Sequence, residues 1–569
     1  MNQDISDKSS SPDDLTVSSP TALPDGNTTV EANKSGKHSY GQILKSTAII
    51  GGSTAINIVI RMLRIKVMAL LLGPSGIGLM GLYENIIELT QKIVGMGINS
   101  SGVRQIAEAV GSNDQQRISR TAQVLQRTSV FLGLLGAVFI VGFSTQLAEF
   151  SFGSDQHATG VALLSLAVFC NLLSDGQGAL IQGMRRISDL AKIGILGTLY
   201  GTLISIVCVY FFHEDGVVLS LVLVSAIGLI TSWWYKRKIV LPAYPLISAQ
   251  VGREQADLLK LGFAFMTSGL MVFGSAYLVR IFIVRNVGVD AAGLYQSAWA
   301  LGGLYIGFIL QAMGADFYPR LTAIVSNHSE CNRVVNEQAH VSLLLAGPGV
   351  IATLTFAPLA IAIFYTSKFD GAIELLRWLC LGMTLRVISW PMGYIIVAKN
   401  DQKLFIFAEL AWTVVYLALA WVSVKTYSLN GAGIAFFWSY IFHVAMIYFI
   451  VRKLTDFRWT TENVKTSLFF LTLIAIVFVS FYILPSWLTI VIGTLATVLS
   501  AIYSIRVLVN FISPDRIPRS VSRLLVKLRL TESSTVRRQT ATNDSNKPRL
   551  LNLKWLVFAL MILAAIFLA

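Results

Sequence analysis

The chain has 569 residues, of which 54% are hydrophobic and only 13% are charged, and it carries a formal net charge of +14. Soluble domains contain about 25% charged residues, so a chain this long and this apolar cannot cover a water-facing surface. The composition therefore excludes an ordinary soluble enzyme, and the apolar content excludes a largely disordered chain. The excess of Lys and Arg indicates either nucleic-acid binding or the cytoplasmic loops of a membrane protein.

The first 40 residues are polar, lack the apolar core of a signal peptide and are predicted to form a disordered cytoplasmic tail. From residue 43 onward, apolar segments of about 20 residues follow one another, which is the length that spans a bilayer. A basic cytoplasmic linker is predicted at 509–550, and the apolar run 551–569 is either a further span or an interfacial helix. The predicted spans are 43–72, 79–103, 121–144, 159–183, 193–212, 216–235, 260–284, 293–317, 339–364, 372–396, 403–424, 431–451, 466–484 and 487–508.

The connections between these spans alternate strongly in charge. One set of alternate connections contains 17 Lys and Arg residues, whereas the other set contains only Arg285, Lys368 and Lys425. Loops rich in Lys and Arg stay on the cytoplasmic side of the membrane. The basic excess therefore indicates topology, not nucleic-acid binding, and places the N-terminus in the cytoplasm. The basic set comprises 104–120, 184–192, 236–259, 318–338, 397–402 and 452–465.

A shift of 215 residues brings several sequence features into register. The segment 73–79, Gly-Pro-Ser-Gly-Ile-Gly-Leu, falls on 288–294, Gly-Val-Asp-Ala-Ala-Gly-Leu, and Gly216 falls on Gly431. Because six spans separate the two copies, both halves would have the same orientation, as in transporters that bind substrate between their halves. Chance matching between glycine-rich loops is the alternative interpretation.

The predicted fold is therefore an all-α polytopic membrane protein. Two six-helix bundles, an N-lobe at 41–240 and a C-lobe at 253–455, would surround a central cavity, and 466–508 would add two extra spans. The longest outer connection within the lobes, 145–158, is short for an active site, which favours a transporter over a membrane enzyme. No ATP-binding motif or metal-ligand spacing occurs, so we predict no cofactor and no metal.

Three segments carry a resemblance to a known family. They are 73–79 after the first span, Phe-Tyr-Pro-Arg-Leu-Thr at 317–322, and Phe-Asp-Gly-Ala at 369–372 running into Tyr-Ile-Ile-Val-Ala-Lys at 394–399. With these segments, residues 41–455 resemble the polysaccharide-transporter branch of the multidrug/oligosaccharidyl-lipid/polysaccharide (MOP) exporter superfamily, and within it the Wzx-type flippases. The tail and everything after 455 depart from the usual twelve spans of that family.

The resemblance implies both a function and a place in the cell. Members of the family move undecaprenyl-pyrophosphate-linked oligosaccharides, such as O-antigen repeat units of lipopolysaccharide, from the inner to the outer leaflet. We therefore expect a flippase of the bacterial inner membrane, with membrane lipids around it and a glycan polymerase and a chain-length regulator as candidate partners. A multidrug exporter of the same superfamily is the alternative, and a membrane enzyme of polysaccharide assembly is a more distant one.

A lipid-linked glycan requires a hydrated cavity with cations for its pyrophosphate, because charged groups inside a membrane are costly. Arg61 and Arg64 lie three residues apart on one face of the first span, and the guanidinium fork matches phosphate. We predict that both bind substrate, since a multidrug exporter would carry carboxylates at this depth. The alternatives are that they extend outward to the membrane surface or that they pair with Glu84 and Glu88 of the second span, which would otherwise couple transport to protons.

The C-lobe carries its own polar residues at membrane depth. Arg386 lies near mid-span with no acidic neighbour along its helix, which makes it the strongest cavity candidate of this lobe. Two acidic residues, Asp175 in the fourth span and Glu409 in the eleventh, are predicted to couple transport or neutralise charge together with the glutamates of the second span. The remaining predicted substrate-binding residues are Arg280, Trp299 and Gln311.

Overall fold

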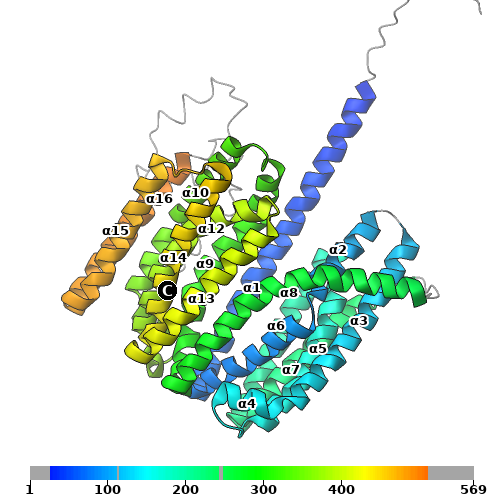
Figure 1. The fold of residues 1–569 in the computed structure, drawn as a ribbon, viewed down its shortest axis with the longest axis horizontal. Helices are drawn as coiled ribbons and strands as arrows, with labels where there is room; N and C mark the ends of the chain where they lie inside the picture. The colour runs from blue at the N-terminus through cyan, green and yellow to red at the C-terminus, as the bar shows by residue number, and fades with distance from the viewer. Residues whose placement is uncertain (1–25, 112–113, 242–247, 511–569) are drawn as a thin grey trace, which may run out of the picture.

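The computed structural model describes residues 26–111, 114–241 and 248–510, and the regular elements in these stretches are all helical (Figure 1). Ten helices of the described stretches are long and apolar enough to cross a membrane. The predicted all-α, multi-pass fold is therefore confirmed. The predictions for residues 1–25, for the linker after residue 510 and for the apolar run 551–569 lie outside the described residues.

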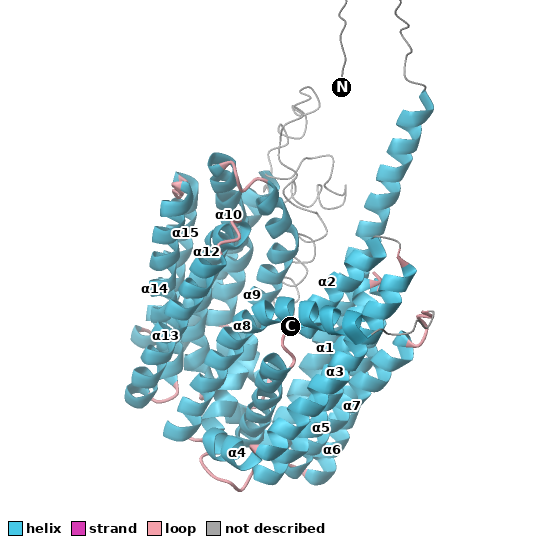
Figure 2. Cartoon of the chain, turned by 45° about the vertical axis from the view of Figure 1, so that its right-hand side comes forward, coloured by secondary structure: helices cyan, strands magenta, loops and turns pink. Residues whose placement is uncertain are grey.

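The helices form two groups on either side of the molecule, as Figure 2 shows. In the first group, α3 packs on α5, and both α5 and α6 pack on α7. Short connections between these helices produce the antiparallel arrangement. The helices of this group are α1 (Gly26–Val94), α2 (Ile98–Gly111), α3 (Gln115–Gly142), α4 (Ser144–Phe152), α5 (Ala158–Gly183), α6 (Ile187–Phe212) and α7 (Asp215–Lys236).

In the second group, α12 packs on both α14 and α10, and α13 packs on α14. The two C-terminal helices, α15 and α16, lie against α10 on the outside of this group. The helices are α8 (Ser248–Asn286), α9 (Val289–Ala323), α10 (His328–Thr355), α11 (Ala357–Phe364), α12 (Ala372–Ala398), α13 (Gln402–Tyr427), α14 (Asn430–Thr455), α15 (Thr461–Ile483) and α16 (Ser486–Asn510), with a short 3-10 turn at Ser367–Phe369.

Helix α8 contacts both groups. Its first half lies against α2 and α3, where Glu254 forms an ion pair with Arg120 and a Cβ on Gly262 would meet the Met96 carbonyl. Its second half packs against α9 and α13. The lobe boundaries predicted at 240 and 253 remain predictions, and α8 itself is shared between the groups.

Helix α1 joins two spans that the hydropathy pattern separates. The chain leaves helical geometry only at Gly73, whose φ is 66° and ψ is −168°, and Pro74 then opens the second segment. Glycine adopts positive φ without steric cost, and proline is favoured at the first position of a helix. Two predicted boundaries differ from the structure: residues 26–40 are helical rather than disordered, and the second segment ends at Val94, not at 103.

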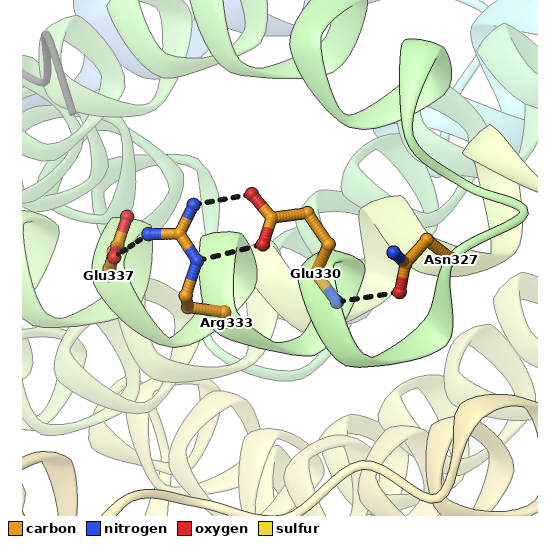
Figure 3. Close-up of polar contacts among 4 residues, drawn as sticks. All are labelled: Asn327, Glu330, Arg333 and Glu337. Atoms are coloured by element: carbon orange, nitrogen blue, oxygen red, sulfur yellow. Dashed lines mark hydrogen bonds and ion pairs between the residues drawn. The ribbon is translucent and has the colours of Figure 1, made fainter. Parts of the chain in front are cut away.

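Helix α10 begins eleven residues before its predicted apolar span. The Asn327 side chain accepts a hydrogen bond of 3.2 Å from the Glu330 amide, so it caps the helix. Arg333 then pairs with Glu330 one turn before it, with Nε to Oε2 at 3.0 Å, and with Glu337 one turn after it (Figure 3). These i,i+3 and i,i+4 pairs stabilise a polar helical extension, which hydropathy alone does not detect.

The backbone repeats at the offset found in the sequence. Non-glycine residues with positive φ occur at Arg185 and Asn400 and again at His213 and Ser428, each pair separated by 215 positions. Gly73 and Gly288 also share positive φ at this offset. A Cβ on Gly216 would lie 2.3 Å from the Cys208 carbonyl oxygen, and a Cβ on Gly431 would lie 2.0 Å from the equivalent oxygen of Ser423. These geometric matches support an internal repeat of the two halves.

A buried amide network fixes the C-terminal helices to α10. Asn336 donates a hydrogen bond of 3.0 Å to the Arg458 carbonyl and accepts one of 2.9 Å from the Thr460 amide. The Asn463 side chain in α15 donates to both the carbonyl and the side-chain oxygen of Asn336 at 2.8 and 2.9 Å. One asparagine therefore holds the connection that leads into α15.

Replacing Asn336 with alanine should destabilise the protein by about 2–3 kcal/mol, because several buried partners lose their hydrogen bonds together. The expected result is a lower melting temperature of the purified protein in detergent. Asn286→Ala is the matched control, since Asn286 is exposed and, among the described residues, its side chain bonds only within its own helix. Equal melting temperatures for the two variants would contradict this role of Asn336.

Candidate functional site

A cavity of about 460 Å³ opens among α12, α13 and α14 and is closed by parts of α1, α8 and α9. Its walls are dominated by aromatic side chains, and four charged side chains, Glu88, Arg280, Arg386 and Glu409, reach it. A concave site lined by rings with a few polar groups is the usual form of a ligand site. The aromatic residues are Phe273, Tyr295, Trp299, Trp390, Tyr394, Phe405, Trp412, Tyr416, Phe436 and Tyr440.

Three pairs of rings stack one helical turn apart along the cavity walls. Trp390 and Tyr394 lie 6.3 Å apart with planes inclined by 8°, and Trp412 and Tyr416 lie 5.4 Å apart at 11°. The third pair is Tyr295 with Trp299, at 6.0 Å and 22°. Each ring combines a flat apolar face with a polar edge. The cavity can therefore pack flat ligand groups while it donates and accepts hydrogen bonds.

Arg386 projects into this aromatic wall from α12. Its guanidinium carbon lies 5.2 Å from the Trp390 ring centre, and the carboxylate of Glu409 on α13 is a nearby opposite charge. Within the described residues, however, no carboxylate oxygen lies within 4.0 Å of the Arg386 guanidinium. Its forked N–H groups are therefore free of a direct ion pair and can meet an anion in the cavity.

Arg280 is more firmly held than Arg386. It is only 8% exposed, donates to the Gly81 carbonyl at 2.9 Å and also bonds the Gln296 side chain, so it joins α8 to α1 and α9. Its Nε is buried and has no partner within the described residues. Arg280 therefore contributes a positive charge from a fixed position and keeps one donor unused.

His443 and Ser389 were not predicted from the sequence, and they lie in the cavity wall. The His443 Nδ1 is 3.1 Å from the Ser389 hydroxyl, and its ring packs edge-on against Trp412 and Tyr440.

The i,i+4 spacing of the aromatic pairs is the only sequence signal for the aromatic wall of the cavity. Such spacing also occurs in helix cores and interface belts, so it does not distinguish a cavity.

The predicted residues of the first two spans lie in different places. Arg61 is exposed and Arg64 is half-buried, and neither lines the cavity. The Arg64 Nε and Nη2 have no partner within the described residues, and Glu84 is a nearby opposite charge without a direct ion pair. Of the two predicted glutamates, only Glu88 reaches the cavity.

Other predicted residues also lie away from the cavity. Asp175 on α5 lies near Asn99 and Lys92, so it belongs to a separate polar group in the first helical group. Trp299 lines the cavity as predicted. The side chain of Gln311 lies outside the described residues.

A second arginine of α12 contacts the C-terminal helices instead of the cavity. The Arg377 guanidinium carbon lies 3.4 Å from the Phe481 ring centre, and Glu374 accepts a 3.0 Å hydrogen bond from the Tyr482 hydroxyl. Both side chains of this i,i+3 pair therefore contact α15. The contrast with Arg386 shows that depth in the membrane alone does not identify a cavity arginine.

The chain is similar to several known membrane transporters. The lipid III flippase of Escherichia coli K12 is 23% identical over 412 residues, which cover 71% of this chain and 97% of the relative. A lipid II flippase structure in an inward closed conformation matches with a TM-score of 0.60 and 13% identity over 82% of this chain and 100% of its own. An inward-facing multidrug transporter of the MOP superfamily matches with a TM-score of 0.59 and 16% identity over 70% and 96%.

The two structural matches show that the chain shares the fold of these two transporters. A family profile described as polysaccharide biosynthesis protein matches residues 67–374, which is more than half of the chain. The match spans the kink of α1, the helix α8 that both groups share and the first turn of α12. The chain therefore belongs to the polysaccharide biosynthesis protein family.

Proposed function

We propose that the protein is a flippase that moves an undecaprenyl-pyrophosphate-linked oligosaccharide from the cytoplasmic to the outer leaflet by alternating access. One observation carries the proposal: a cavity among membrane-spanning helices combines arginines with walls of stacked aromatic rings. Pyrophosphate requires cations with directed donors, and sugar rings require flat apolar faces edged by polar groups. The family, and the relative named lipid III flippase, support this substrate class.

The arginines and the aromatic rings of the cavity suggest two separate roles in substrate binding. Arg386, which has no direct ion pair in the described residues, would bind the pyrophosphate, with Arg280 supplying a second, fixed charge. The aromatic pairs on α12 and α13 would pack against the sugars of an O-antigen-type repeat unit. Arg61 and Arg64 remain proposed for the N-lobe part of the path, because the unused donors of Arg64 would gain partners on meeting a phosphate.

The proposal is tested by deleting the gene and analysing the lipid-linked oligosaccharides that accumulate. We expect the intact repeat unit to accumulate on the undecaprenyl carrier while surface glycan disappears, and a plasmid copy should reverse both effects. Altered drug susceptibility without such accumulation would instead support a multidrug exporter. Accumulation of a shortened oligosaccharide would point to an enzyme of assembly and would overturn the proposal.

The acidic residues near the cavity are proposed to couple or neutralise charge. Glu88 lines the cavity, with Arg280 and Lys92 as its neighbouring cations, while Glu84, Asp175 and Glu409 extend the acidic set. If protons drive the cycle, Glu88→Gln should reduce glycan export about tenfold, because the amide cannot exchange a proton. The measurement is surface glycan at matched protein levels. Glu462→Gln, at an exposed position outside the cavity, is the control, and equal export by both variants would remove Glu88 from the coupling mechanism.

We further propose that the protein lies in the bacterial inner membrane with a cytoplasmic N-terminus, and that a glycan polymerase and a chain-length regulator act beside it. The charge asymmetry of the loops supports this orientation. Alkaline phosphatase inserted in the connection 213–215 should be active, whereas the same insertion in 397–402 should be inactive. The reverse pattern would contradict the orientation.

A further inference from the structure

The two halves touch at equivalent positions on the side of the molecule that carries few basic residues, here called the outer face. A Cβ on Gly78 would lie 2.3 Å from the Val289 carbonyl oxygen, and a Cβ on Gly293 would lie 1.9 Å from the Pro74 carbonyl oxygen. Gly78 and Gly293 are 215 positions apart, so the repeat meets itself at this crossing. The backbones of the two halves are therefore in direct contact at this crossing.

Two short helices lie at the same outer face, and they are also equivalent. Helix α4 follows α3 after a break at Phe143, and α11 follows α10 after a break at Phe356, with similar backbone angles at both breaks. The last carbonyl groups of any helix have no partner within the helix and form the negative end of its dipole. Each of these helices therefore presents a site for a cation at its C-terminal end.

A cation from the opposite half occupies each of these sites. Lys66 of α1 donates to the Ala362 carbonyl of α11 at 2.7 Å and also to the Tyr365 carbonyl just beyond it. Arg285 of α8 donates to the Glu149 and Phe150 carbonyls of α4 at 3.1 and 3.0 Å. The first long helix of each half thus caps the outer helix of the other half.

We propose that Lys66 and Arg285 are paired latches that hold the outer face closed, and that both must release before this face can open. The contacts are directional, charge-assisted and reciprocal, so losing either one should raise the population of the open state. A hydroxyl contact between Ser151 of α4 and Tyr277 of α8 reinforces the Arg285 latch. Closure of the outer face by these contacts does not depend on which substrate is carried.

The test measures how fast a buried reporter thiol reacts. Ala292→Cys serves as reporter, because Ala292 is 1% exposed and adjoins Gly293 at the crossing. The four native cysteines are replaced by serine, and the purified protein in lipid nanodiscs is treated with a polar maleimide. Lys66→Met and Arg285→Met should each raise the labelling rate about five-fold or more, and the double variant should raise it further.

Matched variants keep the test decisive. Lys368→Met removes a cation from the same face whose side chain donates to no helix carbonyl in the described residues, and it should label at the parental rate. Lys66→Arg and Arg285→Lys retain the charge and should also remain slow. If the methionine variants do not fold, Lys66→Gln and Arg285→Gln replace them. Parental labelling rates in both latch variants, or equal acceleration by Lys368→Met, would overturn the proposal.

Discussion

Replacing Arg386 with alanine is expected to leave the protein inserted in the membrane and to abolish surface glycan, with export reduced about 100-fold or more. Arg386 is the cavity arginine whose guanidinium has neither a hydrogen bond nor a direct ion pair in the described residues, whereas Arg280 is hydrogen-bonded, so removing Arg386 takes away the donors that the proposed pyrophosphate would meet. The loss should appear in transport and not in folding, because no described hydrogen bond depends on this guanidinium. Surface glycan at matched protein levels is the measurement.

Two further variants show whether the position or the charge matters. Arg386→Lys should restore export only in part, since an ammonium group lacks the fork that binds phosphate through two parallel bonds. Arg377→Met is the matched control on the same helix, because Arg377 packs on Phe481 outside the cavity and should leave export nearly unchanged. Full glycan display by Arg386→Ala would show that this arginine does not bind the substrate.

The all-helical membrane fold was predictable because apolar segments of bilayer length leave few alternatives. The helix boundaries were less predictable where a helix extends beyond its apolar segment into charged sequence. The extension at the start of α10 is polar, and only its i,i+3 and i,i+4 ion pairs around Arg333 reveal a helix. The kink at Gly73 also hides the continuity of α1, because a Gly-Pro pair is read as a loop.

The candidate site was predictable in part. Arg386, Arg280, Trp299, Glu88 and Glu409 line one cavity, in keeping with their depth in the membrane. Depth, however, does not specify which neighbouring helices a side chain faces, and Arg61 and Arg64 do not line the cavity.

The aromatic wall was not predicted, because stacked i,i+4 rings at positions such as Trp412 and Tyr416 have the same spacing as core residues. Only the packing of α12, α13 and α14 places these rings on the two sides of one space. The cavity is thus a property of helix packing, whereas its charged residues can be recognised one helix at a time.

Replacing Gly293 with alanine is expected to prevent closure of the outer face. The added Cβ would lie 1.9 Å from the Pro74 carbonyl oxygen and 3.0 Å from the Gly78 amide nitrogen, both of which are backbone atoms that cannot rotate away. Overpacking of this kind costs about 1–3 kcal/mol or more, and here separation of α1 from α9 at the crossing relieves it. We therefore expect loss of export together with faster labelling of Ala292→Cys, since the variant would favour the open outer face.

Gly78→Ala should reproduce this effect, because Gly78 occupies the equivalent position in the other half and approaches the Val289 carbonyl as closely. Gly303→Ala, in the same helix as Gly293, is the matched control: no atom lies within 4 Å of its added Cβ, and alanine favours helix by about 1 kcal/mol over glycine. The two variants therefore separate contact across the crossing from general changes in helix α9. Normal export by Gly293→Ala would mean that the crossing does not limit the transport cycle.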